Sequence, residues 1–237
     1  MTLSLLHVHP HSGTVAAITA TGGVAVGGYV HHVWRGLGAC VTQGLVTNPW
    51  YPDGVRRRLE AGDDAGAALA SVVGADVGRA QRQCLVMDAR GRAALHTGAD
   101  NLPAVACRIA PGVAVVGNML ADAAVIDALM RRFLDSCCDN AGEVMASVHG
   151  DVMPRFRRDY AERLLETLIE ALAAALDAGG DRRGTHSAAL RIEAFDDAPL
   201  DLRVDWAEHD LIAELAGLAR RVRAPAFSDF LAVMPRR

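Results

Sequence analysis

The order of strand-like and helix-like segments constrains the fold of this chain more than any single motif. Runs of small, apolar and β-branched residues dominate the first 50 residues, as expected for β-strands. Segments with apolar residues at helical spacing follow, and paired strand-like runs then return before a long helical part. Alternating strand and helix units would indicate a parallel sheet, whereas this order favours stacked layers of sheet and helix. We therefore predict an α+β fold with mostly antiparallel sheets.

The same patterns predict the individual elements. Strands are expected at residues 3–9, 14–20, 38–45, 83–88, 92–97, 105–109, 113–117, 187–194 and 200–204, with two strands around a glycine turn within 15–30. Helices are expected at 51–61, 64–73, 121–134, 155–178 and 209–221, with Asp53 and Asp63 or Asp64 as N-caps. Because no repeat or low-complexity linker interrupts the chain, we predict one domain over 1–223 and a tail at 224–237 without a clear period.

Composition excludes several classes of function. The net charge of -4 offers no general attraction to nucleic acid, and no strand alternates aromatic with basic residues. The five cysteines are odd in number and lack CxxC spacing, which is typical of reduced thiols in a cytoplasmic protein. The uncharged stretch 15–30 contains glycines and is shorter than the roughly 20 residues of a membrane span. We expect a cytoplasmic protein without a membrane or nucleic-acid partner.

The chain begins Met1-Thr2, directly before the first predicted strand. Loss of Met1 would leave Thr2 with both a hydroxyl nucleophile and a free α-amine that can act as its base. All 24 basic residues are arginine, so this amine would be the only one in the protein. A model α-amine titrates at about 7.7–8.0 and is therefore partly neutral near physiological pH. Many chains begin Met-Thr without such chemistry, so the motif needs structural context.

Polar or glycine-rich stretches stand where several predicted strands end. They are Thr42-Gln43, Thr47-Asn48-Pro49, His96-Thr97-Gly98, Gly117-Asn118-Met119-Leu120, and Gly179 to Gly184 with Ser187 beyond. Each alone is explained by a turn or cap. Together they offer the groups that acyl transfer needs, with Asn118 as an oxyanion donor and Asp181 orienting an amine. Arg182 or Arg183 would hold a substrate carboxylate.

The nine histidines are candidates for metal binding and catalysis. His7, His9 and His11 alternate along a strand, but no acidic or cysteine partner lies near them in sequence. A solvated strand end explains them better than zinc or nickel, and we expect no metal. His96 lies at a strand end, where a structural hydrogen bond is favoured over a catalytic role.

From the first residues to about residue 220, the chain resembles the family catalogued as domain of unknown function 1028. The resemblance rests on Met1-Thr2-Leu3-Ser4, Ala25-Val26-Gly27, Gly36-Leu37-Gly38-Ala39 with Thr42-Gln43, Thr47-Asn48-Pro49 with Tyr51, Asp88-Ala89-Arg90-Gly91, His96-Thr97-Gly98, Gly117-Asn118-Met119-Leu120, Gly179-Gly180-Asp181-Arg182-Arg183-Gly184, Ser187-Ala188-Ala189 and Asp201-Leu202-Arg203-Val204-Asp205. That family is placed among the N-terminal nucleophile (Ntn) hydrolases.

The resemblance implies a four-layer αββα sandwich with two sheets face to face and helices outside. It also implies an amide hydrolase that needs no cofactor, with Thr2 as nucleophile. The expected catalytic residues are Thr2, Asn118 and Asp181. The expected substrate-binding residues are Thr42, Asn48, His96, Arg182 and Ser187. The expected substrate is a small or peptide-like amide, and apolar helix faces are compatible with a homodimer.

The chain departs from the family pattern at two positions. Relatives usually carry a cation where Gly22 stands, and an acidic residue where His9 precedes the proline. Either another arginine, Arg35 or Arg182, supplies the missing charge, or the protein is a binding or regulatory member with impaired catalysis. A working hydrolase should place Thr2 at the end of a central strand at the bottom of a cleft. His96, Asn118, Asp181, Arg182 and Ser187 should then be candidates to converge around it.

Overall fold

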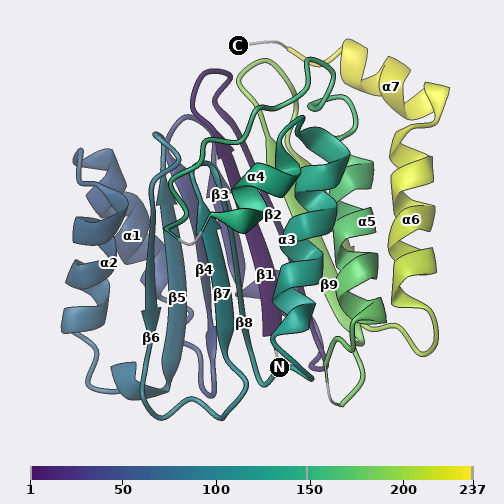
Figure 1. The fold of residues 1–237 in the computed structure, drawn as a ribbon. Coiled ribbons are helices and arrows are strands. Elements are labelled where there is room, and N and C mark those ends of the chain that lie inside the picture. The colour runs from purple at the N-terminus through teal and green to yellow at the C-terminus, as the bar shows by residue number, and fades with distance from the viewer. Residues whose placement is uncertain (1, 148, 182, 236–237) are drawn as a thin grey trace.

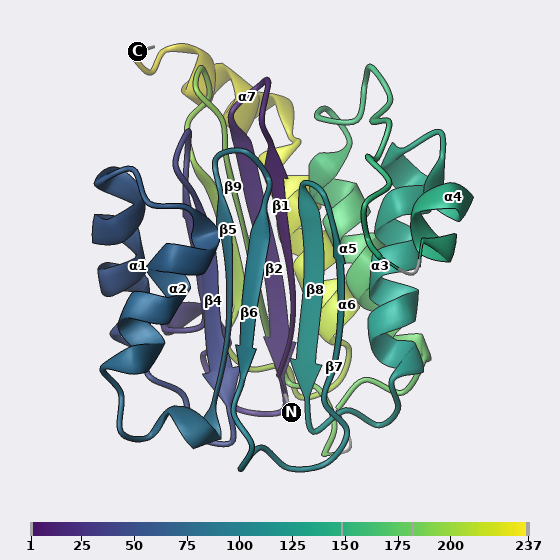
Figure 2. The same cartoon turned by 60° about the vertical axis from the view of Figure 1, so that its left-hand side comes forward.

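The computed structural model describes residues 2–147, 149–181 and 183–235. The strands are β1 (Thr2–His9), β2 (Thr14–Thr21), β3 (His31–Trp34), β4 (Gly38–Gly44), β5 (Arg82–Asp88), β6 (Ala93–Thr97), β7 (Ala106–Ala110), β8 (Val113–Asn118), β9 (Ser187–Glu193) and β10 (Leu200–Val204). They form two antiparallel sheets, ordered β10-β9-β2-β1-β8-β7 and β3-β4-β5-β6 (Figures 1 and 2). The α+β class with antiparallel sheets is confirmed.

Seven α-helices lie within the described ranges. They are α1 (Tyr51–Glu60), α2 (Ala65–Gly74), α3 (Ala124–Cys137), α4 (Ala141–Ala146), α5 (Leu164–Asp177), α6 (Leu211–Val222) and α7 (Pro225–Ala232), and two 3-10 turns, η1 (Val26–Gly28) and η2 (Arg79–Gln81), accompany them. Helices α1 and α2 lie beside the four-stranded sheet, and α3, α5 and α6 lie on the side of the six-stranded sheet (Figures 1 and 2). None of these helices combines the length and apolar character that a bilayer crossing requires.

Buried apolar side chains form three clusters, which follow from the period-two alternation of the strands. Along β1, Leu3 and Leu5 pack with the helices of the six-stranded sheet, including Phe133 of α3. Leu6 and Val8 point the other way, into a cluster that also contains residues of β4 and β5. A third cluster joins α1 and α2 to the outer face of β4 and β5. The strand β1 therefore has both of its faces buried.

The predicted helix at 155–178 is wrong over its first part, because α5 begins only at Leu164. Phe156 instead pairs with Cys138 in an isolated β-bridge, and the Arg157 amide donates to the carbonyl of Cys137 at 2.8 Å. The Arg157 guanidinium also donates to the carbonyls of Ser136 and Cys138 at the end of α3. This segment is therefore used to close the C-terminus of α3, whose last carbonyls lack helical partners.

Three further expectations differ from the structure. Within residues 15–30 only β2 is a strand, and the chain then turns through η1, where Ala25 has a φ of 57°. Strand β3 begins at His31. Helix α4 was not predicted, and the tail contains α7. The division into a domain at 1–223 and a tail stays a prediction.

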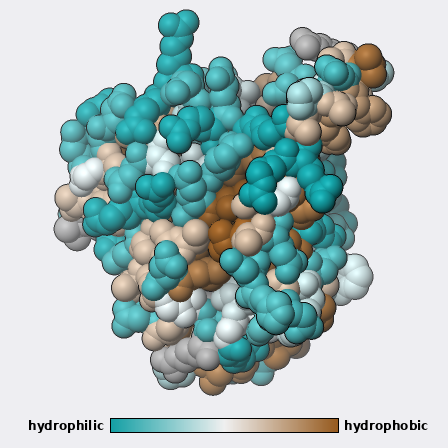
Figure 3. Space-filling view, turned by 90° about the vertical axis from the view of Figure 1, so that its right-hand side faces the viewer, coloured by the Kyte–Doolittle hydropathy of each residue, from teal (hydrophilic) through white to brown (hydrophobic). Residues whose placement is uncertain are grey.

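The face that carries α6 and α7 exposes apolar residues among polar ones (Figure 3). On α7, Phe230 is 54% exposed, and Val233 just beyond it is 80% exposed.

Candidate functional site

Polar side chains gather at one end of the interior between the two sheets. Because alternate residues share a face, Thr2 and Ser4 of β1 point to the same side as Leu6, which belongs to the apolar cluster between the sheets. Strand register brings similar residues beside them from the neighbouring strands. We call this group the inter-sheet polar cluster, and it comprises Thr2, Ser4, Thr19, Thr21, Gln43, Gln83, Thr97, Asn118 and Ser187.

Two glutamines link the sheets within this cluster. Gln43 Nε2 of β4 donates to the Thr2 carbonyl at 3.0 Å, and Gln83 Nε2 of β5 donates to the Gly117 carbonyl at 3.2 Å. Since a carbonyl can only accept, both amides have a defined orientation. Gln43 Nε2 also donates to Gln83 Oε1 at 2.8 Å, while Ser4 Oγ donates to Gln43 Oε1 at 2.8 Å. The buried network therefore holds the start of β1 against the four-stranded sheet.

Thr2 lies at the beginning of β1, a central strand of the six-stranded sheet. Its neighbours in register are Thr21 on β2 and Asn118 on β8. The Thr2 hydroxyl is half-buried and donates to Thr21 Oγ1 at 3.3 Å. The Thr2 side chain thus stands at the boundary between the buried polar network and the strand end.

Asn118 is buried beside Thr2 and has unused hydrogen-bonding capacity. Its Nδ2 donates to Gln83 Oε1 at 3.2 Å, which leaves a second N–H on the same nitrogen. Its Oδ1 is buried and has no hydrogen-bond partner within the described part of the chain. A buried acceptor without a partner costs roughly 1–3 kcal/mol, so Oδ1 is available to accept from a donor, while the second N–H of Nδ2 is available to an acceptor.

Asp181 reaches the same end of the sheet from the chain after α5. It forms an isolated bridge with Leu120, two residues beyond β8, and its Oδ2 accepts the Gly22 amide at 2.7 Å. Arg183 donates to both carboxylate oxygens, at 3.2 Å to Oδ1 and 2.9 Å to Oδ2. Burial alone raises the pKa of Asp181, but these donors outweigh it and lower the pKa below the ordinary value. Asp181 is therefore held as a carboxylate.

The backbone at Gly22 has no room for a side chain. A Cβ there would lie 2.5 Å from the Gly184 carbonyl oxygen and 2.6 Å from Asp181 Oδ2. Among the described residues, the Arg183 guanidinium is linked to this position through Asp181. Arg35 lies at the opposite end of the sheet, where it pairs with Glu193 at 3.4 Å. Arg35 therefore does not supply the charge expected near Thr2, and Arg182 lies outside the described residues.

Ser187 is buried at the first position of β9, in register with Thr21. Its hydroxyl donates to the Gly23 carbonyl at 2.7 Å and accepts the Val26 amide at 3.3 Å. These bonds hold the turn that follows Thr21 and its neighbour Gly22. Ser187 thus supports the site through the backbone of residues 22–26.

Three predicted site residues lie elsewhere. His96 of β6 shares the helix-facing side of its sheet with Cys84, and its Nε2 hydrogen-bonds the Arg79 carbonyl at 2.8 Å. Thr42 bonds to Thr47 Oγ1 and the Asn48 carbonyl, both at 3.0 Å. The structure therefore brings Thr2, Asn118, Asp181 and Ser187 together and leaves Thr42, Asn48 and His96 apart from them.

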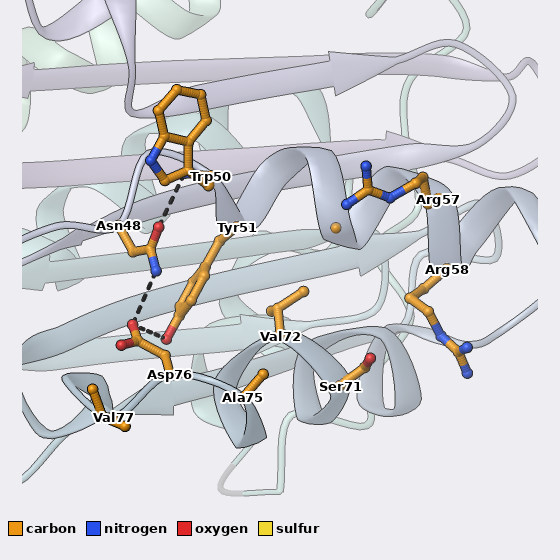
Figure 4. Close-up of a pocket in the computed structure, with 11 residues that line it drawn as sticks. Asn48, Trp50, Tyr51, Arg57, Arg58, Ser71, Val72, Ala75, Asp76 and Val77 are labelled. Atoms are coloured by element: carbon orange, nitrogen blue, oxygen red, sulfur yellow. Dashed lines mark hydrogen bonds between the residues drawn. The ribbon is translucent and has the colours of Figure 1, made fainter.

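Asn48 instead borders an open cavity of about 510 Å³ between α1 and α2 (Figure 4). Its Nδ2 donates to Asp76 Oδ2 at 3.0 Å, and the Tyr51 hydroxyl donates to the same oxygen at 2.8 Å. Arg82 Nε adds a third bond at 3.0 Å. Hydrogen bonds from Arg82 and Asn48 lower the pKa of Asp76. Three side chains therefore donate to Asp76 Oδ2, and we assign Asp76 a structural role.

The sequence did not predict Gln83 or Thr21 as site residues. The signal available for Gln83 was a polar residue directly before the apolar run Cys84 to Met87. Strand alternation alone cannot show that its partner is Asn118 on the other sheet.

His7 is buried within an aromatic group made by Phe133, Phe156 and Tyr160. Its Nδ1 hydrogen-bonds the Gly112 carbonyl at 2.8 Å, which makes Nδ1 the protonated nitrogen in the neutral ring. Burial lowers the pKa of His7 to about 4. Among residues 2–147, 149–181 and 183–235, no group of three His, Cys, Asp or Glu side chains is placed to hold a metal ion.

Comparison with known proteins agrees with this fold. The model of the family of unknown function (DUF1028) matches residues 2–215. A crystal structure of protein SPO2555 from Silicibacter pomeroyi, described with the same family, is similar with a TM-score of 0.82 and 28% sequence identity. The similarity covers 99% of this chain and 92% of that chain. No curated protein matches the sequence. The chain belongs to the family of unknown function DUF1028.

Proposed function

We propose that this protein is an amide hydrolase of the Ntn type, built as a four-layer αββα sandwich with Thr2 as its N-terminal nucleophile. One observation carries the proposal. The hydroxyl of Thr2 stands at a central strand end where Thr21, Asn118 and the Asp181–Arg183 pair meet, although they are distant in sequence. Converging polar groups of this kind are what acyl transfer requires.

The reaction begins with loss of Met1, which frees the α-amine of Thr2. This amine takes the proton of the Thr2 hydroxyl as Oγ1 attacks the carbonyl carbon of the amide. The tetrahedral oxyanion is stabilised by the second N–H of Asn118 Nδ2 and by backbone amides at the strand end. The protonated amine passes its proton to the leaving nitrogen, and the C–N bond breaks. Water then hydrolyses the ester formed on Thr2, which releases the carboxylic acid.

The Asp181–Arg183 pair and Thr21 position these groups. The pair holds the Gly22 amide next to Thr21, whose hydroxyl accepts the proton of the Thr2 hydroxyl in the resting arrangement. This hydrogen bond breaks when the Thr2 hydroxyl attacks the substrate. The Thr21 hydroxyl oxygen can then accept a hydrogen bond from the α-amine and orient it. The proposed substrate is a small or peptide-like amide, as the resemblance to the Ntn hydrolases implies. We place the reaction in the cytoplasm, without a nucleic-acid or membrane partner.

The proposal is tested first by the intact mass of the purified protein. A mass without Met1 supports it, and a mass with Met1 on the active protein would contradict it. Hydrolysis of a panel of small amides and dipeptides is then followed by release of free amine. Thr2→Ala should abolish turnover, and Asn118→Ala should lower it by about 10²–10³-fold, as for other oxyanion donors.

Asn140→Ala is the matched control, because Asn140 is also a buried asparagine but lies at α4 and bonds Met153 and Arg155. It should leave the turnover number unchanged. Equal loss in both asparagine variants would show that folding, rather than oxyanion binding, is affected.

The second candidate function is a binding or regulatory protein on the same scaffold. It is favoured by Gly22, which leaves no space for the cation expected at that position. Wild-type protein with a free Thr2 amine that hydrolyses no amide in the panel would support this candidate.

A further inference from the structure

A second polar cavity lies away from Thr2, beside the edge strand of the smaller sheet. It has a volume of about 770 Å³, within the range of small-molecule sites. Its walls come from β3, from β9 and β10, and from α1. The charged and histidine residues that line it are His31, His32, Arg35, Arg56, Glu60, Arg191, Glu193, Asp201 and Arg203.

The charged residues of β9 and β10 belong to the inner faces of these strands. Arg203 is in register with Ala189, a member of the apolar cluster between the sheets, and Asp201 is in register with Arg191. Since paired residues share a face, Arg191, Asp201 and Arg203 point toward the side on which β3 lies. The interior between the sheets thus becomes charged where it reaches the edge of β3.

His31 faces this charged wall from β3 and has an unused ring nitrogen. The residue is 5% exposed, and its Nδ1 is buried with no hydrogen-bond partner among the described residues. Burial lowers the pKa of His31 to about 3, and the positive charges of Arg191 and Arg203 add to this effect. His31 is therefore a neutral ring held next to cations.

The arginines differ in how many of their N–H groups are used. Arg191 donates to Glu193 through Nε and Nη2 and to Asp201 through Nη1, so all three nitrogens of its guanidinium group are used in hydrogen bonds. Arg203 has one hydrogen bond within the described chain, from Nη2 to Asp205 Oδ1 at 3.0 Å. A Cβ on Gly27 would lie 2.9 Å from Arg203 Nε, so this glycine allows the guanidinium to lie against the backbone. Arg203 therefore has free donors at the cavity.

These unused groups define the ligand. Arg203 has donors that lack acceptors at the cavity. His31 adds one more in the tautomer that protonates Nδ1, so a ligand that brings acceptor oxygens matches both residues. Four arginines and three carboxylates line the cavity, which leaves a surplus of one positive charge. A single carboxylate matches that surplus and the planar guanidinium fork, whereas a phosphate dianion would be repelled by the acidic side chains. His32 and Trp34, whose ring centroids lie 6.2 Å apart, line the cavity from the face of β3 opposite to His31.

We propose that the cavity beside β3 binds a small organic monocarboxylate, with Arg203 and His31 holding the carboxylate group. This site goes beyond the proposed hydrolase function and does not depend on it, since Thr2 lines no part of the cavity.

The test is an NMR titration of the full-length protein that follows the His31 ring resonances. The probes are benzoate and acetate, with benzyl alcohol as the uncharged match to benzoate and inorganic phosphate as the dianion. We expect saturable shifts with benzoate and acetate, weaker binding of phosphate, and no shift with benzyl alcohol. Arg203→Gln should weaken benzoate binding by about tenfold or more, as expected for loss of a charge-assisted pair.

Arg108→Gln is the control, because Arg108 also lies on a strand at the edge of the six-stranded sheet and pairs with one exposed aspartate, Asp127. It should bind benzoate like the wild type. His31→Leu provides a second variant that removes the ring nitrogen without removing a charge, and its thermal melting checks that it is folded. Failure of both carboxylates to bind, tighter binding of phosphate, or equal affinities of the two arginine variants would each overturn the proposal.

Discussion

At the scale of single residues, Gly22 shows how a missing Cβ determines local structure. The Gly22 amide donates to Asp181, and the Gly184 carbonyl passes over the position where a Cβ would stand. Gly22→Ala should push these groups apart and lower the free energy of unfolding by about 1–3 kcal/mol, the usual cost of overpacking. Urea denaturation measures this difference.

Gly74→Ala is the matched exchange, since a Cβ on Gly74 would meet nothing within 4 Å at the end of α2. It should be neutral or stabilising by up to about 1 kcal/mol, because alanine is the better helix former. An equal loss in both variants would mean that the space around Gly22 is not what matters.

His7 provides a pH-dependent prediction at the same scale. Its pKa is about 4 in the folded protein and 6.5 for an ordinary histidine. Between these values the unfolded chain binds more protons, so the stability contributed by His7 is present above pH 6.5 and is lost as the pH falls toward 4. The slope is about 1.4 kcal/mol per pH unit for one histidine.

His7→Asn tests this contribution, because the asparagine amide can replace Nδ1 as the donor to Gly112 without titrating in this range. We expect the variant to be less stable at neutral pH and to lose less stability between pH 6.5 and 4 in urea titrations. The exposed His209→Asn should keep the wild-type slope. A His7→Asn slope equal to that of wild type would show that His7 is not the titrating group.

At the scale of elements, helix starts show what local sequence can and cannot predict. Asp63 and Asp64 were the two alternatives predicted for the N-cap of α2. The structure selects Asp64, which accepts the Ala67 amide at 2.9 Å. Asp53 is not an N-cap, because α1 already begins at Tyr51 and places Asp53 inside its first turn. Pro52 explains the earlier start, since proline is well suited to the first turn of a helix.

Removal of these two carboxylates should therefore have different effects. Asp64→Ala is expected to lower the free energy of unfolding by about 1 kcal/mol through loss of the cap. Asp53→Ala should cost less, at about 0.3 kcal/mol or slightly more, because only the interaction with the helix dipole is lost. Thermal and urea melts of both variants compare them, and a larger loss for Asp53→Ala would contradict the observed start of α1.

At the scale of the whole molecule, Gln83 connects the two sheets. It donates to Thr97 on its own sheet and to the Gly117 carbonyl on the other, and it accepts from Asn118 and Gln43. Gln83→Met keeps the approximate volume but leaves buried polar partners unsatisfied. The expected loss is about 1–3 kcal/mol for each group that finds no new partner.

Gln81→Met is the control, since Gln81 lies in the turn η2 outside the space between the sheets. Gln81 is half-buried, and its side chain makes no hydrogen bond within the described chain. The exchange should change the free energy of unfolding by less than about 0.5 kcal/mol. If Gln83→Met were equally mild, the inter-sheet network would not be a main link between the sheets.

Much of the fold could be predicted from the sequence because its signals are local. The apolar, strand-like runs at residues 3–9 and 113–117 correspond to β1 and β8, and the helical spacing near 64–73 corresponds to α2. The helix predicted from residue 155 failed because Arg157 bonds to the end of α3, which a local pattern cannot reveal. The same limit applies to η1, where the chain turns instead of forming a second strand.

The sequence by itself determined most of the strands and helices, the family, and the polar residues at several strand ends. Only the tertiary structure decided which of those residues meet. Asn118 and Asp181 lie beside Thr2 because β8 pairs with β1 and the chain after α5 bridges to Leu120. His96 points away because its place in β6 puts it opposite Cys84, on the helix-facing side. Helix capping, turn hydrogen bonds and apolar spacing act over a few residues, whereas the register between distant strands is set by burial of whole faces.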